Sequence, residues 1–132
     1  MKIFMMTDIE GVAGVVSFTQ QAYPDGKYYE QAKLLLTAEV NAAIDGLIEV
    51  GAQDVLVFDG HGAGGIDYDT LHPSAKLLHG RPVAPRETWE PIVAEYDACM
   101  IVGQHAMAGA RLGNMNHTQS SLAIDSYTLN GQ

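Results

Sequence analysis

The sequence has few cysteines, few basic residues and no long apolar run, and each shortage argues against a class of protein. The single cysteine, Cys99, cannot form an internal disulfide, which predicts a reducing, cytoplasmic location. Only 7 lysines and arginines stand against 16 acidic residues, and the formal net charge of −9 argues against nucleic acids and anionic membranes as partners. No apolar run approaches the roughly 20 residues of a membrane span.

The residues that are present predict one α/β domain over residues 1–132, with a mostly parallel sheet and flanking helices. Hydrophobic residues make up 47% of the 132 positions, enough for a packed core. Apolar runs predict buried strands, helical spacing predicts helices, and a weaker run predicts a short strand. The strands are expected at 2–7, 54–58, 75–80 and 98–103, and the helices at 27–51 and 88–96. A loop is expected at 8–26, and two short extended pieces are expected within 121–132.

Three local features accompany these elements. Cys99 lies in a predicted buried strand and is expected to be a small core residue. Thr88 is expected to cap the second helix, which would place Pro91 in its first turn. Asn130 and Gly131 are expected to form a type I′ turn.

Polar side chains of metal-ligand type follow three of the predicted strands. Asp8 and Glu10 follow the first strand, Asp59 and His61 follow the second, and His105 follows the last. Because sites in open α/β sheets form beyond the carboxyl ends of the strands, we expect these side chains to meet at one edge. A solvated strand end explains each residue taken alone, but the repetition at three strand ends favours a metal site.

Carboxylate oxygens and imidazole nitrogens together suit zinc or another divalent transition metal, in a one-metal or a two-metal site. His117 follows in the stretch "NMNHT", and three roles stay open for it: a further ligand, a general acid or base, or a surface histidine. We expect His72 and His79 to be structural.

Two other kinds of site are weaker alternatives. The stretch "GHGAGG" at residues 60–65 has the glycines of a phosphate-binding loop but lacks the lysine and serine or threonine of a P-loop. The acidic end of the first strand is similar to magnesium-dependent phosphoryl-transfer enzymes, but magnesium prefers oxygen ligands to histidine.

Five stretches together resemble the D-aminopeptidase family, metallopeptidase family M55, over nearly the whole chain. They come in the family's order: "MTDIEGVAGV", "VLVFDGHG", "LHPSAKLLHG", "IVGQHAMAG" and "NMNHT". The resemblance implies a zinc-dependent aminopeptidase with two ions in each complete site. It also implies release of N-terminal residues, notably D-amino acids, from short peptides, and a ring-like homo-oligomer.

Matched residue by residue, the resemblance implies that Asp8, Glu10, His61 and His105 bind zinc, with Asp8 bridging the two ions. His117 matches the family's catalytic histidine, a nucleophile or proton-transfer group. The family has one more glutamate ligand, which nothing in this sequence matches, and its members are longer. Residues 1–132 are therefore expected to be the N-terminal metal-binding domain of a longer protein. The alternative functions are a non-catalytic metal-binding subunit and a metal-dependent phosphohydrolase.

Overall fold

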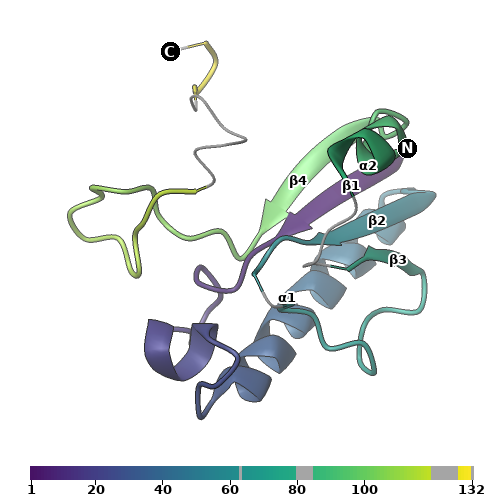
Figure 1. Ribbon diagram of the computed structural model, residues 1–132. Helices are drawn as coiled ribbons and strands as arrows, with labels where there is room; N and C mark the ends of the chain where they lie inside the picture. The colour runs from purple at the N-terminus through teal and green to yellow at the C-terminus, as the bar shows by residue number, and fades with distance from the viewer. Residues whose placement is uncertain (63, 80–84, 120–127, 132) are drawn as a thin grey trace.

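The computed structural model describes residues 1–62, 64–79, 85–119 and 128–131 as an α/β fold. Its elements follow the predicted order along the chain, as Figure 1 shows by colour. These elements are β1 (Lys2–Thr7), η1 (Phe18–Ala22), α1 (Tyr29–Glu49), β2 (Asp54–Asp59), β3 (Ala75–Leu78), α2 (Arg86–Val93) and β4 (Ala98–Val102). No helix in the described part of the chain is long and apolar enough to cross a membrane.

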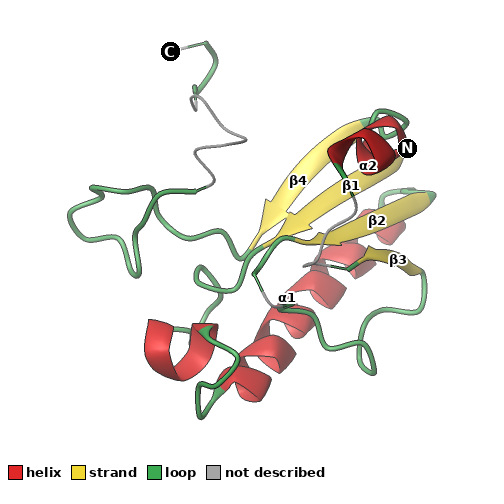
Figure 2. Cartoon of the chain, viewed as in Figure 1, coloured by secondary structure: helices red, strands yellow, loops and turns green. Residues whose placement is uncertain are grey.

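The four described strands form one parallel sheet in the order β3-β2-β1-β4. The strand order reverses at β1, because β2 and β3 lie on one side of it and β4 on the other. In sheets of this kind, the crevice at the carboxyl ends of the strands beside such a reversal is where ligands bind. The chain thus brings the residues after β1, β2 and β4 to one edge, and in Figure 2 the three arrowheads point toward that edge.

Helix α1 covers one face of the sheet and makes the core with it. Its buried side chains recur at helical spacing, and four of them lie on the sheet: Ala32, Leu36, Val40 and Ile44. They pack against the strand residues that point to the same face, which include Ile3, Met5, Val55 and Val57. Burial of a side chain the size of Leu36 stabilises the fold by about 1.5–3 kcal/mol, so this layer holds β1 and β2 together.

The end of α1 is also defined by local hydrogen bonds. The Gly51 N–H donates to the Ile48 carbonyl at 2.9 Å, and the Ala52 N–H donates to the Leu47 carbonyl at 2.9 Å. This pair of bonds is the Schellman motif, which satisfies carbonyls that a helix end leaves free. The helix end predicted at Gly51 is therefore confirmed to within two residues.

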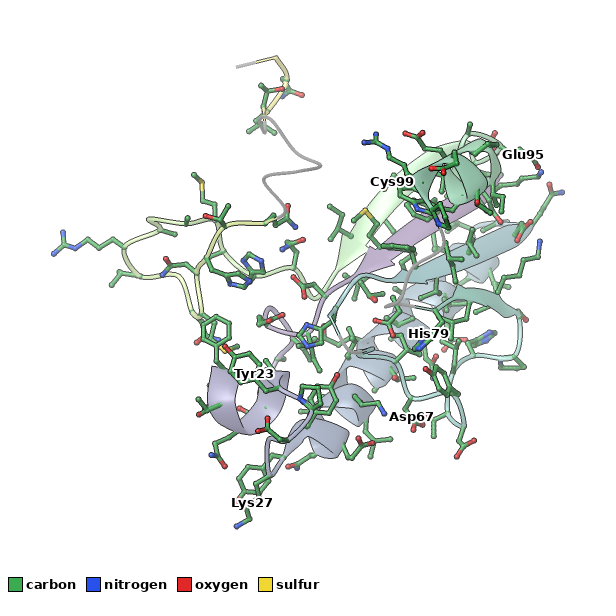
Figure 3. All side chains as sticks on the ribbon, in the orientation of Figure 1. Tyr23, Lys27, Asp67, His79, Glu95 and Cys99 are labelled. Atoms are coloured by element: carbon green, nitrogen blue, oxygen red, sulfur yellow. The ribbon has the colours of Figure 1, made fainter. Side chains whose placement is uncertain are left out.

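The prediction that Cys99 is a core residue is wrong, because the side chain is exposed. Strand β4 is the edge of the described sheet, and Cys99 pairs in register with Phe4, whose side chain points away from α1. Ile101, two residues on along the same face, is 45% exposed. Figure 3 shows Cys99 on this strand. An apolar run in the sequence predicts a buried strand, but it does not reveal which face of the strand other parts of the chain cover.

The prediction that Thr88 caps the second helix is also wrong. Helix α2 begins one residue after Pro85, whose carbonyl accepts the Thr88 N–H at 2.8 Å, and no side chain caps it. Pro91 therefore lies inside the helix rather than in its first turn. Because proline has no N–H, Pro91 cannot donate the helical hydrogen bond to the Glu87 carbonyl. Trp89 contacts Phe58 of β2, with ring centroids 5.7 Å apart, so α2 lies over the sheet face opposite α1.

Two further segments complete the comparison with the sequence. The five-residue π-helix η1 lies within the stretch expected to be a loop. Asn130 and Gly131 both have positive φ angles, 53° and 81°, as a type I′ turn requires. The extended segment expected before this turn falls mainly on residues 120–127, outside the described part of the chain.

A close backbone junction joins the ends of β1 and β4. The Gly11 N–H donates to the Gly103 carbonyl at 2.7 Å, and the Asp8 N–H donates to the Val102 carbonyl at 3.0 Å. A Cβ atom on Gly103 would lie 2.0 Å from the Asp8 carbonyl oxygen, and one on Gly11 would lie 2.1 Å from the Gln104 carbonyl oxygen. Gly103 also has a φ of +73°, so both positions need glycine.

We therefore predict that Gly103→Ala destabilises the fold by more than the roughly 1 kcal/mol typical of a point mutation. The added Cβ would push apart the two loops that carry Asp8 and His105, because the nearest atom in its way is the backbone carbonyl oxygen of Asp8. Gly46→Ala is the matched control: Gly46 lies inside α1, and a Cβ atom there would have no neighbouring atom of the rest of the protein within 4 Å. That control should stabilise the protein by about 0.5–1 kcal/mol. Urea unfolding measures both changes. Equal free energies of unfolding for the two variants would contradict the proposed importance of the backbone junction.

Candidate metal centre

Three predicted ligands lie together beyond the ends of β1 and β2. The His61 Nδ1 atom is 3.4 Å from Oδ1 of Asp8 and 3.2 Å from Oε2 of Glu10. One ligand atom from each residue lies within 4.8 Å of the others, and Glu10 and His61 are buried. Asp8 and Glu10 thus reach one point although the chain turns after β1, where the Val12 N–H donates to the Ile9 carbonyl at 3.3 Å.

The fourth predicted ligand, His105, lies on the other side of Asp8. Its Nε2 atom is 3.5 Å from Oδ2 of Asp8, whose other oxygen faces His61. The Gln104 side chain donates a hydrogen bond to the same Oδ2 at 3.1 Å. The Asp8 carboxylate therefore lies between two imidazoles, with one oxygen toward each.

Hydrogen bonds to main-chain carbonyls fix which ring nitrogen of each histidine is free. Nε2 of His61 contacts the Ala22 carbonyl at 2.7 Å, and Nδ1 of His105 contacts the Ala106 carbonyl at 2.8 Å. A carbonyl only accepts, so these nitrogens carry the hydrogen. The other nitrogens, Nδ1 of His61 and Nε2 of His105, face the acids and are the atoms through which each ring could bind a metal, His61 after the loss of a proton from Nδ1. Metal-binding histidines in proteins are commonly held in this way.

His117 lies beside this cluster, on the loop after β4. Its ring stacks on the ring of His105, with centroids 3.5 Å apart and an interplanar angle of 21°. Its Nδ1 contacts the Met115 carbonyl at 2.8 Å and so carries a hydrogen, which leaves Nε2 to accept a proton. Phe18 of η1 packs edge-on against the ring from 5.2 Å. The geometry thus brings all five sequence-predicted site residues into one neighbourhood.

The remaining candidates from the sequence lie outside the cluster. Asp59 is buried, but both of its oxygens accept hydrogen bonds from backbone N–H groups. His72 lies 3.2 Å from Asp45, and the exposed His79 pairs with the Tyr68 hydroxyl at 2.8 Å. In Figure 3, His79 lies near β3, on the side of the molecule away from the loop that carries His117.

Three residues that contact the cluster were not singled out from the sequence. Gln104 donates to Asp8, the Ala22 carbonyl holds the ring of His61, and Tyr29 lies with its ring 6.1 Å from that of His61. Gln104 directly precedes a predicted ligand, which is a usable signal. The other two come from the loop and helix between β1 and β2, and no local pattern marks them.

The charges in the cluster depend on one another. Burial lowers the pKa of His61, but the nearby carboxylates of Asp8 and Glu10 outweigh this effect and raise the pKa to about 10. Burial raises the pKa of Glu10, but the nearby His61 and Asp8 outweigh this effect and lower the pKa to about 2. For Asp8, burial and the neighbouring Glu10 raise the pKa above its ordinary value. Without a metal, a proton on His61 thus compensates the acids.

The donor set fits a divalent transition metal. Two carboxylates and an imidazole nitrogen converge, which suits zinc by ligand type. Oε2 of Glu10 is buried and accepts no hydrogen bond of good geometry in the described part of the chain, although it lies 3.2 Å from His61. A buried carboxylate oxygen left without a donor is costly, and a cation at this point would satisfy it.

We predict that the metal-free protein loses stability as the pH rises from about 7 to about 10. A pKa raised from 6.5 to about 10 means that His61 contributes stability fully below pH 6.5, and that this contribution is lost as the pH passes the folded-state pKa. The slope is at most about 1.4 kcal/mol per pH unit for one proton. Urea unfolding in a chelating buffer at several pH values measures it.

The matched variants for this prediction are His61→Gln and His72→Gln. The first removes the titrating group between the two acids, so its unfolding free energy should vary less with pH than that of the wild type over this range. The second removes a histidine that pairs with Asp45 away from the cluster, and it should keep the wild-type slope. A wild-type slope in His61→Gln would contradict the electrostatic coupling.

Comparison with known proteins places this chain among peptidases. The model of the family Peptidase_M55, described as D-aminopeptidase, matches residues 1–132. A D-aminopeptidase of Bacillus subtilis (strain 168) is 32% identical over 120 residues, which are 89% of this chain and 42% of the relative. The similarity to this relative therefore extends over nearly the whole of the present chain.

A solved structure agrees with the sequence match. The zinc-dependent D-aminopeptidase DppA from Bacillus subtilis, described as a self-compartmentalizing protease, matches with a TM-score of 0.78 and 31% identity. The match covers 89% of this chain and 42% of that one, so this chain spans less than half the length of the relatives it matches. The α/β fold predicted from the sequence is confirmed, and the chain belongs to the D-aminopeptidase family, Peptidase_M55.

Proposed function

We propose that the protein is a zinc-dependent aminopeptidase that releases N-terminal amino acids, D-residues among them, from short peptides. The observation that carries the proposal is the convergence of Asp8, Glu10 and His61 at one buried point, with His105 on the other side of Asp8. Membership in a D-aminopeptidase family supports the reaction, and the zinc-dependent relative supports the metal.

The proposed zinc ligands are Asp8, Glu10, His61 and His105. A site with two ions is supported by the Asp8 carboxylate, since its two oxygens face different imidazoles. In hydrolases of this kind, zinc supplies Lewis-acid activation of the carbonyl group and of water. The residues of the chain do the rest: Ala22 and Ala106 hold the histidine rings by their carbonyls, and Gln104 orients Asp8.

His117 is the proposed proton carrier. Its Nδ1–H donates to the Met115 carbonyl, so the ring presents Nε2 as the nitrogen that takes and returns a proton. Stacking on His105 and the edge contact with Phe18 hold the ring beside the proposed ligands. A positioned imidazole can accept a proton from the attacking nucleophile and deliver it to the departing amine near neutral pH.

Assembly and location are further parts of the proposal. A homo-oligomer that encloses its active sites is supported by the relative described as self-compartmentalizing. Such an assembly would cover apolar side chains that the chain exposes, such as Leu112 at 95% exposure. A cytoplasmic location is supported by the free, exposed thiol of Cys99, which fits a reducing compartment.

We predict that the full-length, zinc-loaded protein cleaves dipeptides with a free N-terminus and that His117→Ala lowers kcat by about 10²–10⁴-fold with unchanged zinc content. Dipeptides with D- and L-residues at the N-terminus, each free or acetylated, define the specificity, and a phosphate monoester tests the phosphohydrolase alternative. His72→Ala is the matched control, because it removes a histidine that pairs with Asp45 away from the cluster.

Three outcomes would contradict the proposal. Cleavage of the phosphate ester but not of peptides would favour a phosphohydrolase. Tight zinc binding without turnover of either substrate would favour a non-catalytic metal-binding subunit. Full peptidase activity in His117→Ala would leave the zinc site intact but remove the role of His117.

A further inference from the structure

The loop that follows β2 carries His61 and is built around the side chain of Asp59. Asp59 is the last residue of β2, only 1% exposed, and it pairs in register with Thr7 of β1. Its Oδ1 accepts the Gly65 N–H at 2.9 Å, and its Oδ2 accepts the Ile66 N–H at 3.2 Å. Both oxygens are therefore used within the loop, and the group of possible metal ligands in the described part of the chain, Asp8, Glu10 and His61, does not include Asp59.

A second buried side chain holds the same loop at Gly64. The Tyr29 hydroxyl donates to the Gly64 carbonyl at 2.7 Å, and Tyr29 itself is 5% exposed. Burial first, and then the charge of Asp59, raise the pKa of Tyr29 to about 12, so the hydroxyl stays a donor at physiological pH. Asp59 and Tyr29 thus take up one carbonyl and two N–H groups of the loop.

These contacts determine where His61 lies. The Gly64 N–H donates to the His61 carbonyl at 3.0 Å, so the part of the loop held by Tyr29 also fixes the backbone of His61. The ring is fixed separately by the Ala22 carbonyl. A Cβ atom on Gly65 would lie 2.8 Å from Leu36 and 3.4 Å from Cβ of His61, so the loop is pressed between α1 and the histidine.

We propose that Asp59 is a positioning residue for the metal centre and not a ligand: it holds the loop so that Nδ1 of His61 faces Asp8 and Glu10. The proposal rests on the proposed zinc site. A carboxylate suits this task because two adjacent buried N–H groups each need an acceptor, and charge-assisted hydrogen bonds are the stronger ones. An asparagine offers one oxygen and turns an NH₂ group toward the second N–H.

The test measures zinc affinity in the full-length protein by competition with a chromophoric chelator, after the metal has been removed. Asp59→Asn should bind zinc about 10–100-fold more weakly, the usual loss when a group that orients a ligand is changed. Asp67→Asn is the matched control, because the Asp67 carboxylate accepts the Thr70 N–H and hydroxyl in a different turn of the same connection between β2 and β3. It should stay within about twofold of the wild type.

A second pair of variants tests the contact of Tyr29 with the same loop. Tyr29→Phe removes only the hydroxyl that donates to Gly64, and it should weaken zinc binding by about 2–10-fold. Tyr68→Phe, which removes an exposed hydroxyl bonded to His79, should have no effect. If Asp59→Asn does not fold, this pair decides the question.

A cobalt spectrum separates positioning from mere loss of stability. At saturating Co²⁺, the folded Asp59→Asn protein should show d–d bands that differ from those of the wild type, since a displaced His61 changes the coordination. Wild-type zinc affinity in Asp59→Asn, or in Tyr29→Phe where the first does not fold, would overturn the proposal for Asp59 alone. A wild-type protein that binds no zinc would overturn both the proposed function and this role.

Discussion

The structure depends on the contact of one imidazole nitrogen with two carboxylates, of which Glu10 is buried and Asp8 is partly buried. Nδ1 of His61 lies 3.2 Å from Glu10 and 3.4 Å from Asp8, and it is costly to remove either acid from water as an ion without a positive partner. In the metal-free protein, the partner is a proton on His61, which is why the pKa of His61 is raised to about 10. In the proposed site, a zinc ion would take the same place and would satisfy both acids and the imidazole together. The same contact would thus stabilise the metal-free chain and supply the proposed metal ligands.

The parallel sheet delivers the groups that make this contact. Asp8 and Glu10 come from the end of β1, His61 from the end of β2, and His105 from the end of β4, which lies on the other side of β1. The backbone junction at Gly11 and Gly103 brings the end of β4 against the end of β1. After β2, Asp59 and Tyr29 hold the loop that carries His61 through hydrogen bonds to its backbone. Two backbone arrangements, one on each side of β1, therefore set the distances within the centre.

Much of the fold and the composition of the site could be predicted from the sequence, because both follow from local patterns. Apolar runs mark β1, β2 and β4, and polar residues directly after them mark the candidate site.

The exposure of individual side chains could not be predicted in the same way. Cys99 is exposed because β4 is the edge of the described sheet, and an apolar run does not reveal which strand lies at an edge. The start of α2 was missed because Pro85, not Thr88, provides the first acceptor. The free nitrogen of each histidine depends on carbonyls far away in the chain, such as Ala22 for His61, so it required the structure. Asp59 was found as a polar strand end, but only its two backbone hydrogen bonds distinguish a positioning residue from a ligand.

Anomalous X-ray diffraction at the zinc edge, from crystals of the full-length protein grown with zinc, tests the central claim most directly. The account predicts an anomalous peak about 2.0–2.2 Å from an oxygen of Asp8, an oxygen of Glu10 and Nδ1 of His61. It also predicts that Nε2 of His61 stays hydrogen-bonded to the Ala22 carbonyl. A peak away from the two acids, or a zinc ion bound through Nε2 of His61, would contradict it.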